Sequence, residues 1–149
     1  MSNDFKIRRI EAKDKEAFLA MSRDFYASDA VLHNIPEEYH ESCFAELMRS
    51  EDYARAYILE CAGKTAGYAL LSLSYSREAG GLCLWIEELY VLPQFQGRGA
   101  AHIFFKWLEE NIPAARYRLE TEPDNHKAKK LYKSLGYYPL DYEQFIKGN

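Results

Sequence analysis

The sequence has few cysteines and no long apolar segment. Its three cysteines, Cys43, Cys61 and Cys83, are odd in number, far apart and without a CxxC pair, which excludes a disulfide framework. The longest apolar run, Leu82 to Ile86, is too short to span a bilayer. The first fifteen residues are charged throughout and lack the apolar stretch of a signal peptide. We therefore expect a cytoplasmic protein that does not enter a membrane.

A surplus of basic residues is also absent. The chain has 19 Lys and Arg against 23 Asp and Glu, a net charge of −4. An extended nucleic-acid surface needs clustered cations, so we expect no nucleic-acid partner. A local site for a small anion remains compatible with this charge.

Metal-ligating patterns are scarce as well. Glu37, His40 and Glu41 share one helical face, but no further ligand group accompanies them and HExxH is absent. We interpret these three residues as a solvated face and expect no metal.

The 149 residues contain no repeat, low-complexity segment or Pro/Gly/Ser linker, and this length predicts a single domain spanning 1–149. Apolar residues spaced by two predict strands, and those spaced by three and four predict helices. Asp14, Pro36 and Asn125 are placed to begin three of the helices, and Pro113 and Gly136 to end two. The predicted strands are 5–11, 53–61, 65–75, 82–92, 117–122 and 137–146, with helices at 14–25, 36–48, 101–112 and 125–135. This order predicts an α/β fold with a mixed sheet, antiparallel in its first half and of βαβ type in its second.

A glycine-rich turn joins the strongest strand to the most regular helix. It reads Gln96, Gly97, Arg98, Gly99, Ala100, Ala101. A helix start leaves backbone N–H groups unpaired, the helix dipole adds positive potential, and glycines let a phosphate approach closely. The segment matches neither GxGxxG nor a P-loop. On its own, it could equally be a simple strand-to-helix turn.

Two motifs in order point beyond a simple turn. Glu-Glu-Leu-Tyr-Val-Leu-Pro at 87–93, followed by Gln96-x-x-Gly99-x-Ala101, resembles the acetyl-CoA motif of the GNAT superfamily of N-acetyltransferases. Ala101 stands where glycine is commoner. Asn125, Ala128, Leu131-Tyr132 and Gly136-Tyr137 resemble the second signature of the same superfamily. The element order matches that superfamily along nearly the whole chain.

This resemblance implies a GNAT-like acyl-CoA N-acyltransferase fold, with a central mixed sheet of six to seven strands flanked by about four helices. It implies acetyl-CoA as co-substrate, with its pantetheine arm against the backbone of Leu89 and Val91 and near Asn125. The pyrophosphate would lie on the amides of 96–101. Tyr132 would be the general acid that protonates the thiolate; its alternative is a core tyrosine.

Glu87 and Glu88 interrupt an apolar strand and are candidates for the general base. Strict alternation sends them to opposite faces, with Glu87 on the face of Trp85, Leu89 and Val91. Apolar surroundings raise the pKa of a carboxyl group and make it a better base. We favour Glu87, because Val91 lies beside the expected thioester. A structural, ion-paired glutamate and a bulge that changes the parity both remain open.

In this superfamily the loop 25–36 and the start of the second helix cover the acceptor site, and the candidates here are Tyr26, Asp29, His33 and Glu37. The nearby carboxylates favour a cationic amine, such as a polyamine or a lysine-like amine. The predicted activity is transfer of an acetyl group to a primary amine, on a small molecule or peptide, by direct attack. The alternatives are a non-catalytic acyl-CoA-binding module and an enzyme for a longer acyl-CoA. A homodimer, paired through strands or the C-terminal segment, is a further expectation.

Overall fold

The computed structural model describes residues 4–149, and its elements follow the predicted order closely. The strands are β1 (Phe5–Arg9), β2 (Ala54–Cys61), β3 (Lys64–Ser76), β4 (Gly81–Val91) and β5 (Arg116–Leu119). The helices are α1 (Lys15–Tyr26), α2 (Glu37–Arg49), α3 (Ala100–Asn111) and α4 (His126–Ser134). Among these residues no helix is long and apolar enough to cross a membrane. The cytoplasmic location stays a prediction.

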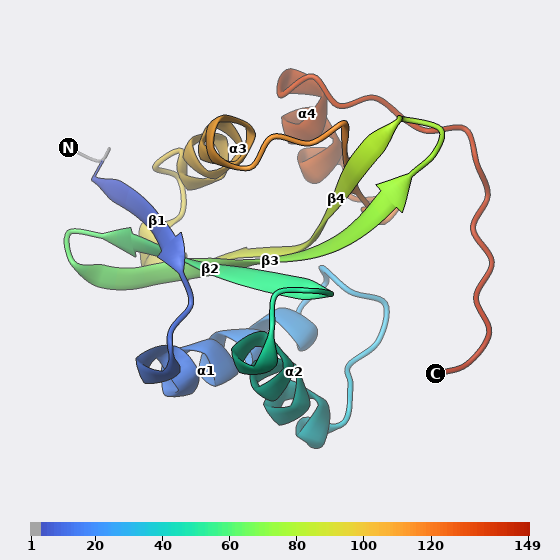
Figure 1. The fold of residues 1–149 in the computed structure, drawn as a ribbon. Helices are drawn as coiled ribbons and strands as arrows, with labels where there is room; N and C mark the ends of the chain where they lie inside the picture. Colours follow the sequence, from blue (N-terminus) through green and yellow to red (C-terminus); the bar gives the residue numbers. More distant parts are fainter. Residues whose placement is uncertain (1–3) are drawn as a thin grey trace.

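The strands form one mixed sheet in the order β1-β2-β3-β4-β5. The first three pairings are antiparallel and the β4–β5 pairing is parallel, as the hairpins and the βαβ pattern predict. Residues 4–149 contribute five strands, fewer than the six to seven expected. The missing strand is 137–146, which runs away from α4 as a long exposed segment (Figure 1).

The helices cover the sheet on both faces (Figure 1). Helices α1 and α2 lie on one face, and α3 and α4 lie on the other. Each face has its own core: Phe18, Phe44 and Tyr68 belong to the first, and Leu84, Phe104 and Leu108 to the second. We call these the α1-side core and the α3-side core.

Asp14 precedes α1 but does not cap it with its side chain. Its carboxylate accepts two hydrogen bonds of 2.8 Å from the Arg8 guanidinium and a third, also 2.8 Å, from the Glu11 N–H. The capping prediction is therefore wrong in its chemistry, because a nearby cation and a preceding 3₁₀ turn compete for the carboxylate. The Arg8 hydrogen bonds lower the pKa of Asp14, against the opposing effect of burial.

A β-bulge in β4 changes the predicted orientation of the paired carboxylates. Leu70 lies opposite Glu88 and Leu71 lies opposite Ile86, so Glu87 is the extra residue. Glu87 then contacts Ser72 and Glu88 contacts Tyr68, two residues of β3 that share a face. Both carboxylates thus lie on the α1 side of the sheet. The predicted opposite orientation is wrong because strict alternation stops at the bulge.

Candidate active site

The outer edge of β4 is unpaired where the cofactor arm was predicted. The parallel pairing with β5 ends at Ile86 opposite Leu119, whereas β4 continues to Val91. The edge of 87–91 that faces away from β3 therefore has no strand beside it in the sheet. Gln96 donates its side-chain amide to the Val91 carbonyl over 2.9 Å. Apart from this contact at Val91, the open edge is compatible with the prediction that the backbone of Leu89 contacts the pantetheine arm.

The glycine turn has a conformation that is compatible with the predicted phosphate site. Gly97 and Gly99 have φ of 77° and 79°, in the left-handed region that favours glycine. Gly99 is the N-cap of α3, which begins at Ala100. A Cβ added to either glycine would meet nothing within 4 Å, so the space beside the backbone is open.

Two members of the turn are already engaged. The Gln96 N–H donates to the Pro93 carbonyl over 3.2 Å, which leaves the amides of 97–101 as the better phosphate donors. The guanidinium of Arg98 lies over the Phe95 ring, 5.5 Å from its centroid. Arg98 therefore adds its positive charge at the same turn.

Helix α4 carries the second predicted motif. Asn125 is its N-cap, and the Asn125 side chain accepts a hydrogen bond from the Ala128 N–H over 3.1 Å. This capping role follows the sequence prediction, and the contact of Asn125 with a cofactor arm stays a prediction. Gly136, with φ of 93°, ends the helix as expected.

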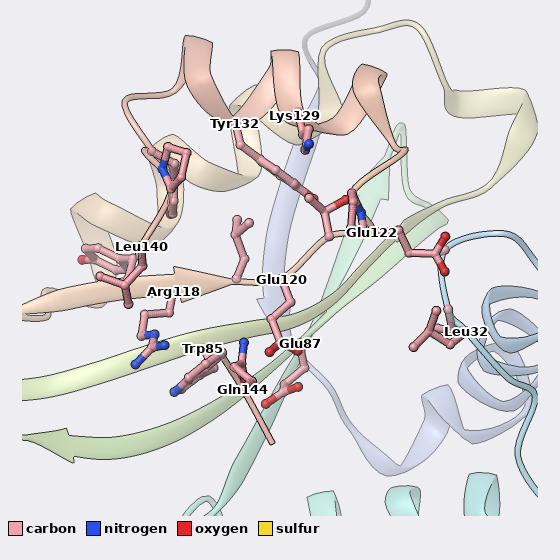
Figure 2. A pocket seen from close by; sticks show the side chains of 18 of the residues that line it. Leu32, Trp85, Glu87, Arg118, Glu120, Glu122, Lys129, Tyr132, Leu140 and Gln144 are labelled. Atoms are coloured by element: carbon pink, nitrogen blue, oxygen red, sulfur yellow. The ribbon is translucent and has the colours of Figure 1, made fainter. Parts of the chain in front are cut away.

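Tyr132 reaches from α4 into the cavity (Figure 2). Its ring packs edge-on against Phe105 of α3, with 6.1 Å between centroids. Burial raises the pKa of its phenol. The hydroxyl therefore stays protonated at neutral pH, as a general acid must before it acts.

A cavity of about 1750 Å³ joins the loop after α1 to β4, β5, α4 and the C-terminal segment. Glu87, Glu120 and Glu122 line it, and Figure 2 shows them on the strand side, below Tyr132 and Lys129. Arg118 also lines it and lies over the Trp85 ring, 4.2 Å from the centroid. Glu120, Glu122 and Arg118 were not predicted as site residues, although all three lie in the predicted strand 117–122. The strand ends earlier than predicted, at Leu119, so Glu120 and Glu122 follow the carboxyl end of β5, where ligands commonly bind in such sheets.

The predicted acceptor residues have different positions. Tyr26 and His33 line the cavity. Asp29 and Glu37 are exposed and do not belong to the cavity lining, so the structure does not group them with the other two. The loop reaches the cavity through a series of neighbouring residues instead: Ala30, Val31, Leu32, His33, Asn34, Ile35 and Pro36.

The two adjacent carboxylates have contrasting surroundings. Glu87 is exposed to the cavity and accepts a 2.6 Å hydrogen bond from the Ser72 hydroxyl. Glu88 is only 7% exposed, and burial raises its pKa. Glu88 accepts hydrogen bonds from Tyr26 and Tyr68 on the α1 side. Of the two, Glu87 is the carboxylate that an acceptor in the cavity can reach.

Of the three residues predicted to form a solvated face, Glu37 and Glu41 are exposed as expected, but His40 is buried. His40 is 3% exposed, and its Nδ1 pairs with the Ser22 hydroxyl over 2.7 Å. The two carboxylates form exposed ion pairs with Arg23 and Lys15. Among residues 4–149 no cluster of three His, Cys, Asp or Glu side chains is placed to hold a metal ion.

The fold, the open strand and the glycine turn together define the class of acyl-CoA-dependent acyltransferases. Comparisons with known proteins agree. Residues 16–137 match the model of the acetyltransferase (GNAT) family. The chain belongs to this family, and it is an acyl-CoA-dependent N-acetyltransferase.

Three relatives illustrate its similarity. An uncharacterised N-acetyltransferase of Lactobacillus delbrueckii subsp. lactis is 28% identical over 97% of this chain and 90% of its own length. The mouse (Mus musculus) thialysine N-epsilon-acetyltransferase is 36% identical, over 47% of this chain and 42% of its own. The structure of AAC(6')-Iy with the bisubstrate analogue CoA-S-monomethyl-acetylneamine superposes with a TM-score of 0.78 at 18% identity, over 97% of this chain and 98% of that one.

Proposed function

We propose that this enzyme transfers the acetyl group of acetyl-CoA to a primary amine of a cationic small molecule. The observation that carries the proposal is a group of carboxylates, Glu87, Glu120 and Glu122, on the strand side of the cavity and beside the open strand edge (Figure 2). Four cationic side chains also line the cavity: Arg116, Arg118, Lys129 and Lys133. Carboxylates concentrate a cationic acceptor and orient its ammonium group. Figure 2 places Glu122 on the side of the cavity nearer Leu32 of the loop. Two of the relatives support this class, because their names include thialysine and an acetylneamine.

The chain offers a group for each step of direct attack. A backbone N–H of the open β4 edge, near Val91, polarises the thioester carbonyl. Glu87 takes a proton from the attacking amine, directly or through water, as the C–N bond forms. Tyr132 donates its phenolic proton to the sulfur as the C–S bond breaks. The products are an amide and the thiol of CoA, so protons and electrons balance without an acyl-enzyme.

The fit of acetyl-CoA to this chain rests on the glycine turn. Open space beside Gly97 and Gly99 lets phosphate oxygens approach the amides of 97–101. The guanidinium of Arg98 lies next to them. A non-catalytic acyl-CoA-binding module would need this turn alone, whereas the presence of Glu87 and Tyr132 in one cavity supports an enzyme.

The test is thiol release from acetyl-CoA with a panel of acceptors: polyamines, lysine, aminoglycosides, peptides and neutral amines of matched size. We expect kcat/KM at least tenfold higher for cationic amines than for neutral ones. Glu87→Gln lowers kcat/KM at least tenfold, whereas Glu110→Gln, on the exposed face of α3, leaves it unchanged. Equal turnover of neutral and cationic amines would remove the acidic acceptor site from the proposal.

We also propose that two copies of this chain pair through the C-terminal segment, residues 137–149. Its large apolar side chains are exposed in the single chain: Tyr138 83%, Tyr142 62%, Phe145 91% and Ile146 86%. Two polar contacts tether it, Tyr142 to Glu78 and Asn149 to Tyr39. The sequence predicts a strand over 137–146, and β5 is an outermost strand of the sheet formed by residues 4–149. In the proposed dimer, this segment pairs with the outer edge of β5 in the second copy.

The solution mass of the full chain, compared with a chain that ends after Gly136, tests the pairing. We expect a dimer for the full chain and a monomer for the shortened one. A monomeric full chain contradicts the pairing, and so does a shortened chain that remains dimeric.

A further inference from the structure

The buried carboxylate of Glu88 joins three elements of the fold. The Tyr26 hydroxyl donates to one carboxylate oxygen over 2.7 Å, and the Tyr68 hydroxyl donates to the other over 2.6 Å. Tyr26 is the last residue of α1, Tyr68 belongs to β3, and Glu88 belongs to β4. One side chain therefore connects a helix end to two adjacent strands.

This carboxylate is not held by a cation. None of the ion pairs formed by residues 4–149 includes Glu88. Burial raises its pKa, and the two phenol hydrogen bonds lower it in opposition. A well-packed apolar side chain at such a position is often as stable as the buried charge or more so. Overall stability therefore does not explain why a glutamate occupies this position. A requirement for hydrogen bonds in fixed directions does explain it.

Glu88 links two segments that line the cavity, the end of α1 and strand β4. On the helix side, Tyr26 lines the cavity and immediately precedes the loop 27–36. On the strand side, Glu88 follows the bulged Glu87, whose carboxylate lies in the same cavity. The two hydrogen bonds of Glu88 thus fix the start of the loop relative to the proposed base.

The far end of the loop is anchored separately. His40 lies in the first turns of α2, and its Nδ1 pairs with the Ser22 hydroxyl of α1 over 2.7 Å. The His40 ring lies edge-on to Tyr26, with 5.8 Å between centroids. Because α2 is already tied to α1, Glu88 is the buried polar anchor that connects this pair of helices to the strand that carries Glu87. An exposed hydrogen bond of 3.3 Å, from Tyr90 of β4 to Asp24 of α1, is a second link between the same helix and strand.

We propose that Glu88 is a positioning residue that sets the distance between the acceptor loop and Glu87, and so controls amine binding. This inference rests on the proposed function, since it takes the cavity as the acceptor site and Glu87 as the base. Glu88 itself does not exchange a proton with the amine. Its loss displaces Tyr26 from the cavity wall while the glycine turn and Tyr132, on the other face of the sheet, keep their places.

Kinetics of three variants test this role. Glu88→Gln keeps the side-chain size but loses one of the two acceptor oxygens. Tyr26→Phe and Tyr68→Phe each remove one phenol donor, and Tyr90→Phe is the control. Tyr90 lies two residues from Glu88 on the same face, and its hydroxyl donates to the exposed Asp24 of α1 over 3.3 Å. Tyr90→Phe therefore removes the exposed link between α1 and β4 and keeps the buried one, so the comparison isolates the contribution of Glu88.

With spermidine, lysine and neamine as acceptors, we expect Glu88→Gln and Tyr26→Phe to raise the KM for the amine at least tenfold. We expect kcat to change less than threefold and the Kd for acetyl-CoA less than twofold. The acid limb of the kcat/KM pH profile stays in place, because Glu88 does not exchange a proton with the amine. Loss of this limb in Glu88→Gln, with KM unchanged, would make Glu88 the base and overturn the proposal.

Hydrogen exchange provides a readout that needs no turnover. In the last turn of α1, the Ala27 and Ser28 amides donate to the Arg23 and Phe25 carbonyls over 3.0 and 3.2 Å. We expect exchange there at least tenfold faster in Glu88→Gln and Tyr26→Phe than in wild type and Tyr90→Phe. Unchanged exchange overturns the positioning role. If the wild type acetylates none of the three amines, the proposed acceptor class fails, while exchange still decides the role of Glu88.

Discussion

The placement of the acetyl-CoA pyrophosphate at the glycine turn can be tested by a pair of matched substitutions. Gly99→Glu puts a carboxylate at the N-cap of α3, into the open space beside the backbone. The side chain fills the phosphate position, and its negative charge repels the ligand. Gly63→Glu is the control, because Gly63 also has a left-handed backbone (φ 78°) and open space around it. Gly63 lies in the β2–β3 turn, outside the cavity.

The two substitutions are expected to have similar effects on stability. A residue other than glycine in the left-handed region costs about 1–2 kcal/mol. For a chain of this length each kcal/mol lowers the unfolding temperature by about 2–4 °C. Both variants should therefore unfold about 2–8 °C below the wild type. Acetyl-CoA at about 100 times its Kd adds about 2.7 kcal/mol to the folded state, or about 5–11 °C.

Thermal unfolding with and without acetyl-CoA separates the two effects. Wild type and Gly63→Glu should show the full ligand-induced increase in unfolding temperature, and Gly99→Glu should show none. Titration calorimetry then gives the loss of affinity directly. Equal increases in Gly99→Glu and Gly63→Glu would refute the placement of the pyrophosphate on the amides of 97–101.

Three further predictions address the acid, the strand contact and the ion pair. Tyr132→Phe should lower kcat at least tenfold while titration calorimetry gives an unchanged Kd for acetyl-CoA, and unchanged turnover would remove Tyr132 from the mechanism. Gly67→Ala should lower the free energy of unfolding by about 1–3 kcal/mol in a denaturant titration, because its Cβ would overlap the Tyr90 carbonyl of β4. Asp14→Asn should lower it by about 2–3 kcal/mol at pH 7, since it weakens the hydrogen bonds from Arg8. The pKa of Asp14 is lower in the folded chain than in the unfolded chain. The stabilisation by Asp14 is therefore complete above about pH 4 and is lost as the pH falls through the folded pKa. The variant should lack this pH-dependent contribution to the free energy of unfolding.

The order of elements and the helix ends could be predicted from the sequence because they depend on local patterns. The single apolar stripe of 101–112 predicts α3, which spans Ala100–Asn111. Asn125 and Gly136 are the N-cap and the left-handed end of α4, as their residue types indicate. These helix caps depend on residues close together in the sequence, so their prediction agrees with the folded chain.

The orientation of the paired carboxylates depends on more than local pattern. An extra residue at Glu87 is a property of the pairing between β3 and β4, which the sequence of β4 alone does not contain. The bulge brings both carboxylates to one face and leaves them in contrasting surroundings. Glu120, Glu122 and Arg118 were missed for the same reason, since the cavity combines segments far apart in the sequence.

The segment 137–146 is predicted as a strand, but it forms none, and no strand of residues 4–149 lies beside it. A strand needs the edge of another strand to pair with, and the sequence of one segment does not identify the chain that provides this edge. The exposure of Phe145 and Ile146 is the main observation behind the proposed pairing with a second copy.

Acetyl transfer measured at both ends of the reaction tests the central claim most directly. Purified enzyme is given acetyl-CoA and a cationic primary amine, thiol release is followed with time, and the acetylated amine is quantified by mass spectrometry. We expect one acetylated amine for each thiol released, with the rate reduced at least tenfold in Glu87→Gln and in Tyr132→Phe. Acetyl-CoA binding without thiol release above the amine-free background, across the whole panel of cationic amines, would contradict this claim.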